Sequence, residues 1–338
     1  MHRSGFNVMV AYKLVDNIDT PKKDSLRSGF GRGLKRAGDE NEQVVALCAD
    51  LTESTQMHIF RDAHPDRFVE VGIAEQNLVT VAAGMSAMGK KPFASSYAAF
   101  SPGRNWEQIR TTICLNERFT CVVGSHAGIS VGPDGATHQM LEDIALMRVL
   151  PHMQVIVPGD SIEAEKATLA IARQENPTYL RLAREATPVF STEETPFEIG
   201  KAYVLREGHD VSLLSTGTMT YQCLVVAEEL SKDGIMAEVV HVPTVKPLDE
   251  GTIMSSLKKN GRAVTVEEAQ IAGGFGSAIA ELSTAMLPVP IRRLGIKDHF
   301  GESGKPEELL EHFGLSAKNI ASEVREFIKE NPKYHQGV

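Results

Sequence analysis

Residues 119–139 read FTCVVGSHAGISVGPDGATHQ, a short apolar run followed at once by a loop rich in glycine. The apolar run is nearly continuous, which is typical of a strand that is buried on both faces of a parallel sheet. In such a sheet, ligands bind beyond the carboxyl ends of the strands. This stretch therefore predicts a parallel sheet and also predicts the edge at which a functional site should lie.

The same alternation of apolar runs and helical segments extends to both sides of this stretch. In the first half we predict strands over 44–50, 91–100, 119–126, 153–159 and 177–183, and helices over 73–88, 104–116, 139–148 and 161–174. In the second half we predict strands over 210–217, 237–245 and 262–268, and helices ending near 232, over 249–259, after GGFG at 273–276, over 306–313 and over 316–329. Strands that alternate with helices indicate an α/β fold. We expect two doubly wound domains, each a mostly parallel sheet flanked by helices.

The chain of 338 residues exceeds the size at which single hydrophobic cores stop growing, which also favours two domains. The segment STEETPFEIG at 191–200 interrupts the alternation with proline and acidic residues, as linkers between domains often do. We therefore divide the chain into an N-terminal extension (1–24), a first domain (25–190), a linker (191–200) and a second domain (201–338).

Composition excludes several classes of protein. Hydrophobic residues make up 42% of the chain, charged residues 23%, and the net charge is −9, as in an ordinary soluble globular protein. A basic stripe is absent from the sequence, so we expect no nucleic-acid partner. Apolar runs are too short for a membrane helix, and the start of the chain does not resemble a signal peptide, so we expect a cytoplasmic protein with no membrane partner. Cys48, Cys114, Cys121 and Cys223 lie in apolar stretches without metal-site spacing, which predicts buried reduced thiols.

Glu75 lies in EVGIAEQN (70–77), on the first turn of a predicted helix rich in Ala, Val and Met. A carboxylate among apolar neighbours needs a partner, because removing it from water alone costs several kcal/mol. Glu75 could simply be a solvated charge that favours the helix dipole. Because a glycine-rich loop also follows the predicted strand 119–126, we favour contact between Glu75 and a ring nitrogen of a bound cofactor.

The glycine-rich loop offers three polar side chains at the predicted ligand edge. His126, Asp134 and His138 provide donors and acceptors suited to hydroxyl or phosphate groups, while the glycines let the backbone fold closely. Either histidine alone would more often be structural. Two imidazoles and one acid over thirteen positions do not have the spacing of a zinc site, so we predict no metal centre.

Other candidates lie at neighbouring strand ends. Tyr97 and Phe100 end the strand 91–100, and Phe100 could stack on a flat heterocycle or pack in the core. Ser54 follows strand 44–50 and Arg184 ends strand 177–183, where they could form a phosphate clamp at adjacent strand ends. Helix capping and a surface salt bridge are the simpler explanations for these two residues.

Two glycine motifs resemble fragments of a dinucleotide-binding loop, GFGRG at 29–33 and GGFGSA at 273–278. Neither completes the G-x-G-x-x-G pattern within a strand, turn and helix followed by an acidic residue. We therefore interpret both as glycines at a helix N-terminus that pack closely on a sheet.

The motifs VGIAEQN, SSYAAF, SHAGISVGPDGATHQ and LAREAT resemble those of transketolases in order and spacing, and the resemblance covers about residues 25–335. It implies a pyrimidine-binding domain over 25–190 and a transketolase C-terminal domain over 201–338. In that family the glutamate at the position of Glu75 binds N1′ of the aminopyrimidine of thiamine diphosphate, which lets the cofactor lose its thiazolium C2 proton.

The same resemblance implies the roles of the other candidates. Phe100 would stack on the pyrimidine, Tyr97 would line its pocket, and Asp50 would approach the cofactor from the dimer neighbour. His126, Asp134 and His138 would hold the sugar hydroxyls, while Ser54 and Arg184 would bind the sugar phosphate.

The family's diphosphate-binding motif, GDG followed by Asn, does not occur in this sequence. The chain therefore resembles the C-terminal subunit of a split transketolase. That resemblance implies a separate N-terminal subunit that holds the diphosphate with Mg²⁺ or Ca²⁺. It also implies an α2β2 heterotetramer around a dimer of this chain, which alone should be inactive. The expected reaction is transfer of a two-carbon ketol unit from a ketose phosphate to an aldose phosphate.

Three alternatives remain open. The β subunit of the E1 component of a 2-oxoacid dehydrogenase carries GIAEQ but lacks the GPDGATHQ type of loop. A 1-deoxyxylulose-5-phosphate synthase has a similar loop that begins with an acid and an arginine, where this chain has Ser125 and His126. A transketolase-like subunit that only regulates or scaffolds is the third. The sugar pair and the pathway, the pentose phosphate route or a dedicated sugar catabolism, are also left open.

Overall fold

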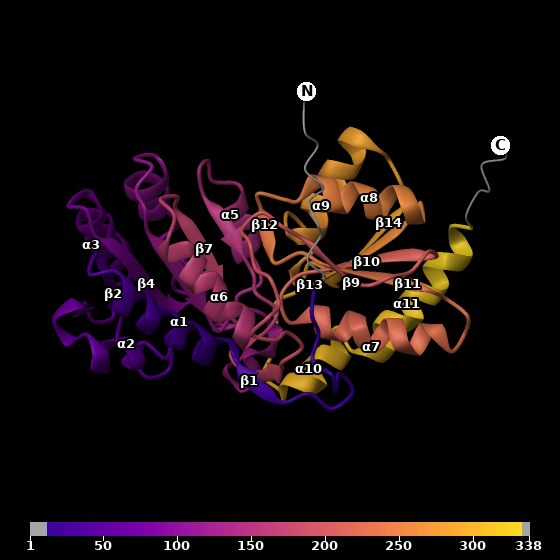
Figure 1. Cartoon of the computed structure of the whole chain (residues 1–338), viewed down its shortest axis with the longest axis horizontal. Helices are drawn as coiled ribbons and strands as arrows, with labels where there is room; N and C mark the ends of the chain where they lie inside the picture. The colour runs from indigo at the N-terminus through magenta and orange to yellow at the C-terminus, as the bar shows by residue number, and fades with distance from the viewer. Residues whose placement is uncertain (1–11, 333–338) are drawn as a thin grey trace, which may run out of the picture.

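The computed structural model describes residues 12–332, which form two α/β units that lie side by side (Figure 1). The indigo-to-magenta half of the chain builds one unit and the orange-to-yellow half builds the other. The predicted class, two mostly parallel sheets flanked by helices, is confirmed. The predicted extension 1–24 and second domain 201–338 include residues 1–11 and 333–338, which lie outside the described residues.

The first sheet has seven strands in the order β12-β6-β7-β5-β4-β2-β3, and the last six of these are parallel. Its central strands are buried along most of their length, which explains why their sequences are apolar without alternation. The parallel strands are β2 (Val44–Cys48), β3 (Phe68–Glu70), β4 (Lys91–Tyr97), β5 (Cys121–Ser125), β6 (Gln154–Ile156) and β7 (Thr178–Arg181).

Helices α1 (Leu26–Glu40) and α6 (Ser161–Ala172) pack against each other beside the first sheet. The interpretation of GFGRG as the N-terminus of a helix packed on a sheet is wrong. Gly29 and Gly33 lie inside α1, and a Cβ on Gly29 would lie 1.9 Å from the carbonyl oxygen of Ser161 at the start of α6. Glycine is needed there because two helices approach closely, at the usual cost of about 1 kcal/mol for glycine within a helix.

The remaining helices of the first unit are shorter or less regular than predicted. The helix expected over 104–116 begins at Trp106 as α4 and continues as η2, a π-helical segment. The full set is α2 (His58–Ala63), η1 (Pro65–Arg67), α3 (Glu75–Ala87), α4 (Trp106–Gln108), η2 (Ile109–Cys114), η3 (Ile129–Asp134) and α5 (Asp143–Arg148).

The second sheet has five strands in the order β14-β13-β10-β11-β9, and only β9 is antiparallel to its neighbour. The strands are β9 (Tyr203–Arg206), β10 (Val211–Ser215), β11 (Ala237–His241), β13 (Ala263–Gln270) and β14 (Ile291–Ile296). The helices are α7 (Met219–Ser231), α8 (Glu250–Asn260), α9 (Phe275–Met286), α10 (Pro306–His312) and α11 (Ala317–Glu330). A core cluster that includes Tyr179 of β7 and Phe275 of α9 joins the two units.

The single strand predicted over 237–245 is in fact two strands. The chain leaves the second sheet after His241, passes Val242 and Pro243, and forms β12 (Thr244–Lys246) at the edge of the first sheet, antiparallel to β6. Proline lacks an N–H group and cannot continue a sheet ladder, which explains the break. Residues from the second half of the sequence therefore complete the first sheet.

The interpretation of GGFG holds for the second motif. Gly274 precedes α9, and a Cβ on Gly276 would lie 2.5 Å from the Thr265 hydroxyl of β13, so glycine allows the helix to pack on the sheet. The carboxylate of Glu267 accepts hydrogen bonds from the backbone N–H groups of Phe275 (2.7 Å) and Gly276 (2.8 Å).

Two further pairings involve segments that were not assigned from the sequence. Strand β1 (Lys23–Ser25) pairs with β8 (Ala186–Pro188), and Leu14 forms a bridge with Ser191. Residues 192–200 contain no helix or strand, and the Lys166 ammonium group donates to three of their carbonyl oxygens.

The four cysteines are free and buried, as predicted. Among the described residues, no helix is long and apolar enough to span a membrane.

Candidate functional site

The carboxyl ends of the parallel strands of the first sheet meet at one edge, and most of the predicted site residues lie there. Ser54 follows β2, Tyr97 ends β4, His126 follows β5 and Arg184 follows β7. The edge arises because each parallel strand returns through a helix, which places all the loops after the strands on the same side of the sheet.

Glu75 is the first residue of α3, and its side chain is only 2% exposed. Its carboxylate pairs with the Arg104 guanidinium at 2.8 Å and accepts a longer bond of 3.4 Å from the Ser96 hydroxyl. Arg104 is 51% exposed, so this buried acid has a partner that reaches it from the solvent side. The Glu75 carboxylate thus has the partner that the sequence predicts, and a ligand could displace this partner because Arg104 is half exposed.

Phe100 lies next to the same arginine. The Arg104 guanidinium carbon is 4.4 Å from the centre of the Phe100 ring, a distance typical of a cation–π contact. The buried carboxylate and the aromatic face therefore contact the same planar, nitrogen-bearing cation.

Tyr97, Phe100, His126 and His138 form one cluster of rings. The rings of Tyr97 and His126 stack with centroids 3.7 Å apart, and the ring of His138 meets that of Phe100 edge-on at 5.3 Å. The Tyr97 hydroxyl lies 2.5 Å from the Ser54 hydroxyl. The sequence motifs, which lie up to 84 positions apart, are thus brought together by direct contacts.

His126 is held in a fixed position and protonation state. Its backbone has φ +56, a left-handed conformation that is uncommon for residues other than glycine and is often found at functional sites. Burial, with further effects from Arg27, Arg184 and His138, lowers the pKa of His126 from 6.5 to about 3. The ring is therefore neutral at pH 7 and can donate or accept a hydrogen bond without carrying charge.

Asp134 and His138 lie on the loop that continues from β5 through η3. Asp134 is exposed and lies 3.6 Å from the guanidinium of Arg184, which also donates to the carbonyl oxygen of Val131 at 2.6 Å. The polar side chains of the loop therefore point toward the same edge as Arg184, next to the ring cluster.

The expectation that Ser54 and Arg184 occupy adjacent strand ends is wrong, because β4 and β5 separate β2 from β7 in the sheet. Arg27 joins them instead. Its guanidinium donates to the carbonyl oxygen of Ser54 at 2.5 Å and to that of Arg184 at 2.7 Å. Ser54 does not cap a helix, and its hydroxyl pairs with that of Tyr97.

Arg27 and Arg104 are two site residues that sequence reasoning missed. Arg27 lies in the first turn of α1, which begins before GFGRG, so placing these glycines at a helix N-terminus left Arg27 outside the helix. Its Nε atom is buried without a hydrogen-bond partner, and burial lowers its pKa. Arg104 lies in the irregular segment between β4 and α4, where a charge just after the SSYAAF motif was the available signal.

Asp50 lies apart from these contacts. It follows β2 with φ +58, is exposed, and is held through its backbone N–H, which donates to the Glu70 carboxylate at 2.7 Å. Among residues 12–332, no group of three or more His, Cys, Asp or Glu side chains is arranged to hold a metal ion.

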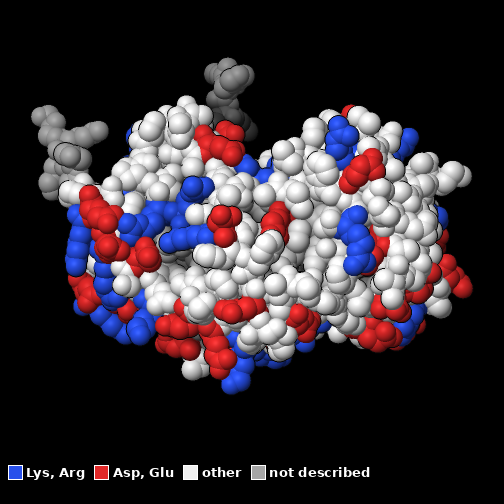
Figure 2. Space-filling view, turned by 180° about the vertical axis from the view of Figure 1, so that it is seen from behind, with Lys and Arg blue, Asp and Glu red and all other residues white. Residues whose placement is uncertain are grey.

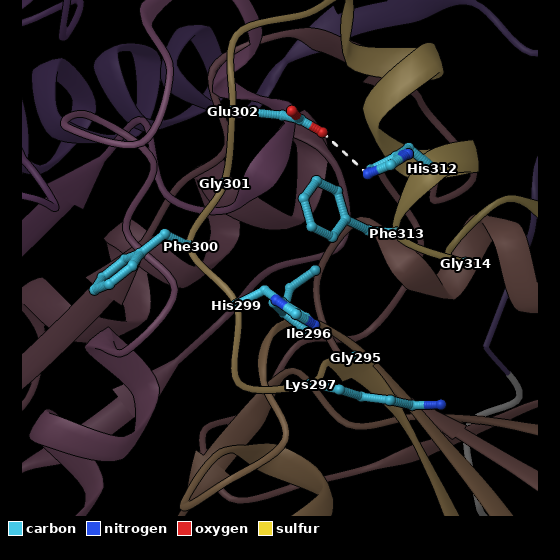
Figure 3. Close-up of a pocket in the computed structure, with 10 residues that line it drawn as sticks. All are labelled: Gly295, Ile296, Lys297, His299, Phe300, Gly301, Glu302, His312, Phe313 and Gly314. Carbon is cyan, nitrogen blue, oxygen red and sulfur yellow. Dashed lines mark ion pairs between the residues drawn. The ribbon is translucent and has the colours of Figure 1, made fainter.

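A surface cavity of about 550 Å³ lies in the second unit, lined by residues of the segment after β14 and of the end of α10 (Figure 3). The ion pair between His312 and Glu302, 3.0 Å long, crosses its upper rim. Both side chains are more than half exposed, and none of the predicted site residues lines this cavity. Chemistry and geometry favour the edge of the first sheet as the functional site.

Comparison with known proteins identifies the two domains of the chain. The family model "Transketolase, pyrimidine binding domain" matches residues 22–189, and "Transketolase, C-terminal domain" matches residues 200–320. A Methanocaldococcus jannaschii protein named "Putative transketolase C-terminal section" is 42% identical over 90% of this chain and 96% of its own length. The "6-deoxy-6-sulfo-D-fructose transketolase subunit SqwH" of a Clostridium species is 41% identical over 89% of this chain and 94% of its own length.

A solved structure described as "Split gene transketolase, inactive beta4 tetramer" superposes with a TM-score of 0.85. It is 42% identical, and the match covers 90% of this chain and 98% of that one. The resemblance to the C-terminal subunit of a split transketolase, which was drawn from the motifs, is confirmed by these matches. The chain belongs to the transketolase family and carries its pyrimidine-binding and C-terminal domains.

Proposed function

We propose that this chain is one of two kinds of subunit in a thiamine-diphosphate-dependent transketolase. The complex would transfer a two-carbon ketol unit from a ketose phosphate to an aldose phosphate. In this proposal Glu75 activates the aminopyrimidine of the cofactor, and the diphosphate is bound by a separate chain.

The observation that carries the proposal is the environment of Glu75. Its buried carboxylate and the face of Phe100 both contact the Arg104 guanidinium, at 2.8 Å and 4.4 Å. An aminopyrimidine is likewise planar and carries ring nitrogens, so an acid and an aromatic face that together accept a guanidinium are chemically suited to it. When bound, the cofactor would supply the carbon nucleophile that ketol transfer needs. Glu75 would hold the proton shared with N1′, Phe100 would stack on the ring, and Tyr97 would line the pocket.

The neighbouring residues are suited to a polyhydroxylated anion. Neutral His126, together with Asp134 and His138, would bind and orient hydroxyl groups. Arg184 would bind the anionic end of the sugar with the Ser54 hydroxyl, and Arg27 is held beside both. The name of one relative refers to a sulfonated sugar, and either a phosphate or a sulfonate is compatible with these arginines.

The partner of this chain would supply the wall that holds the diphosphate and the divalent cation, Mg²⁺ or Ca²⁺. Exposed apolar residues flank α3 and η2, where Ile73 is 75%, Met88 83% and Leu115 74% exposed. Large apolar side chains in such positions are typical of a surface that another chain covers. By contrast, charged residues of both signs are interspersed on the face shown in Figure 2, especially on its left side. We propose that this chain forms a dimer within an α2β2 complex in the cytoplasm. Asp50 of one copy would approach the cofactor bound by the other copy.

Reconstitution tests this proposal. The chain would be mixed with the co-encoded chain that carries GDG and the downstream Asn, together with thiamine diphosphate and Mg²⁺. We expect ketol transfer between a ketose phosphate and an aldose phosphate in the mixture only. Decarboxylation of pyruvate or of a branched 2-oxoacid would instead support a 2-oxoacid dehydrogenase, and condensation of pyruvate with an aldose phosphate would support a 1-deoxyxylulose-5-phosphate synthase. A complex without any turnover would favour a regulatory or scaffolding subunit.

A further inference from the structure

The loop that carries Asp134 and His138 is bordered on its inner side by the second unit. The first unit provides few contacts to the polar side chains of this loop. The charged partner of Asp134 in the first unit is Arg184, at 3.6 Å. The loop as a whole, in contrast, contacts β13 through the backbone of Ser130, the segment between β14 and α10 through the side chain of Gln139, and also α10. The position of the loop therefore depends on residues that lie more than 120 positions further along the chain.

Glu268, near the end of β13, makes the most direct of these contacts. Its side chain is buried, and its Oε1 atom accepts a hydrogen bond from the backbone N–H of Ser130 at 2.7 Å. The Thr218 hydroxyl donates to its Oε2 atom at 3.2 Å. Gly128 lies directly against the carboxylate, since a Cβ there would be 2.3 Å from Oε1. Gly128 also has φ +92, so only glycine allows the loop to approach Glu268 in this way.

The backbone of Glu268 is itself anchored to the first sheet. Arg181 of β7 donates to the Glu268 carbonyl oxygen at 2.9 Å and to the buried Asp143 carboxylate at 2.7 Å. The end of β13 therefore has a fixed position relative to the strand ends that carry the other site residues. The Glu268 carboxylate can therefore hold the start of the loop in a defined position relative to the first sheet.

The second unit also holds the far end of the loop. The Gln139 amide donates to the carbonyl oxygens of Ile129 (3.1 Å) and Glu302 (2.9 Å), and Glu302 belongs to the segment drawn in Figure 3. A Cβ on Gly135 would lie 2.6 Å from the Ser303 hydroxyl. Gln139 belongs to the loop, whereas Glu268 lies outside it, so the Glu268 side chain can be changed without altering the sequence of the loop.

We propose that Glu268 is a positioning residue for the sugar-binding loop, acting through the N–H of Ser130 on Asp134 and His138. The inference rests on the proposed function, because it assigns these two side chains to the sugar. The second domain thereby sets the affinity for the sugar. The hydrogen-bond partners of the Glu75 side chain within residues 12–332, Ser96 and Arg104, belong to the first domain. A carboxylate is effective there because a hydrogen bond to a charged acceptor is stronger than one to a neutral acceptor.

The test uses the reconstituted complex and three variants. Glu268→Ala removes the acceptor, Glu268→Gln keeps an acceptor oxygen without the charge, and Thr218→Val, the matched control, removes the other partner of Glu268 and leaves Ser130 in place. For Glu268→Ala we expect the KM of the sugar substrates to rise about 10-fold with kcat within about twofold, as expected for loss of one charge-assisted contact. Glu268→Gln should fall between wild type and Glu268→Ala, and Thr218→Val should resemble wild type.

Hydrogen–deuterium exchange on the same proteins gives a readout that does not depend on activity. In Glu268→Ala the amides of residues 128–138 should exchange about 10-fold faster, while the amides of α3 should be unchanged, because only the local opening of the loop becomes easier. Unchanged exchange and unchanged KM would overturn the inference, as would faster exchange spread evenly over the chain. If Glu268→Ala does not fold, Glu268→Gln decides by the same two criteria. Absence of ketol transfer in the wild-type complex would refute the proposed function alone, because the exchange result on the loop stands without it.

Discussion

Glu75 in the first unit and Glu267 in the second are both buried carboxylates beside the N-terminus of a helix, but their partners differ in kind. Glu75 pairs with the side chain of Arg104, which is half exposed. Glu267 accepts hydrogen bonds from the backbone N–H groups of Phe275 and Gly276, which cannot leave without unfolding α9. A buried acid with a removable partner can serve a ligand, whereas an acid bound to backbone groups stabilises the structure. This difference is what we expect if the edge of the first sheet binds a ligand and that of the second supports the structure.

Replacing each glutamate by glutamine should separate these two roles, and Glu75→Gln should have the largest effect on catalysis. In the reconstituted complex we expect kcat to fall by ~10² to 10⁴, the usual contribution of acid–base participation, with assembly intact. Steady-state kinetics and size-exclusion chromatography would measure the two properties. Glu267→Gln is the matched control and should keep kcat within about twofold. Wild-type turnover in Glu75→Gln would remove the distinction between the two acids.

The stability of the chain should depend on pH through Glu267. Burial raises the pKa of this carboxyl from 4.5 to about 7, so between these values the folded chain binds a proton that the unfolded chain has lost. The contribution of Glu267 to the free energy of unfolding should therefore be largest below pH 4.5. It should fall as the pH rises to about 7, by at most ~3 kcal/mol. Urea unfolding at pH 5 and pH 8 should show this loss in wild type and a smaller loss in Glu267→Gln. Equal losses in both proteins would place the pH dependence elsewhere.

Arg184→Ala tests whether the edge of the first sheet binds the anionic end of the sugar, through the KM of the substrate. We expect the KM for phosphorylated sugars to rise by ~10 to 100-fold, as one charge-assisted contact to the anion is lost. The KM for a donor without a phosphate should change little. Since Arg184 also donates to the carbonyl oxygen of Val131, an equal rise for both donors would indicate that it supports the loop instead of binding the anion.

The smallest expected effect concerns the partner of Glu75 in the isolated chain. Arg104→Met should lower the free energy of unfolding by ~1 to 2 kcal/mol, less than for a fully buried pair because Arg104 is half exposed. In the Glu75→Gln background the same replacement should cost less, since no buried charge is left unpaired. Urea unfolding of the four proteins gives this double-mutant cycle. Identical costs in both backgrounds would show that the ion pair contributes nothing.

Sequence reasoning located the first sheet and its ligand edge because the relevant signals are local. Strands such as Val44–Cys48 and Cys121–Ser125 are continuous apolar runs, and the parallel-sheet rule then brings Tyr97, His126 and Arg184 to one edge. Strand β14, Ile291–Ile296, was missed because Arg292 and Arg293 interrupt its apolar pattern. Both arginines are partly exposed at the edge of the sheet.

The parts that could not be predicted depend on contacts between distant segments. Strand β12 joins the first sheet although its sequence continues from a strand of the second. Arg27 reaches Ser54 and Arg184 from a helix in which Gly29 and Gly33 allow close packing against α6. Glu268 reaches the loop through Ser130, a contact between two units that carries no signal in either local sequence.

The most direct test of the account is the rate at which the C2 proton of bound thiamine diphosphate exchanges with solvent in the reconstituted complex. NMR after rapid quenching would compare wild type with Glu75→Gln and Glu267→Gln. If Glu75 activates the aminopyrimidine, exchange should slow by ~10² to 10⁴ in Glu75→Gln and stay at the wild-type rate in Glu267→Gln. Wild-type exchange in Glu75→Gln, with the cofactor bound, would contradict the central claim.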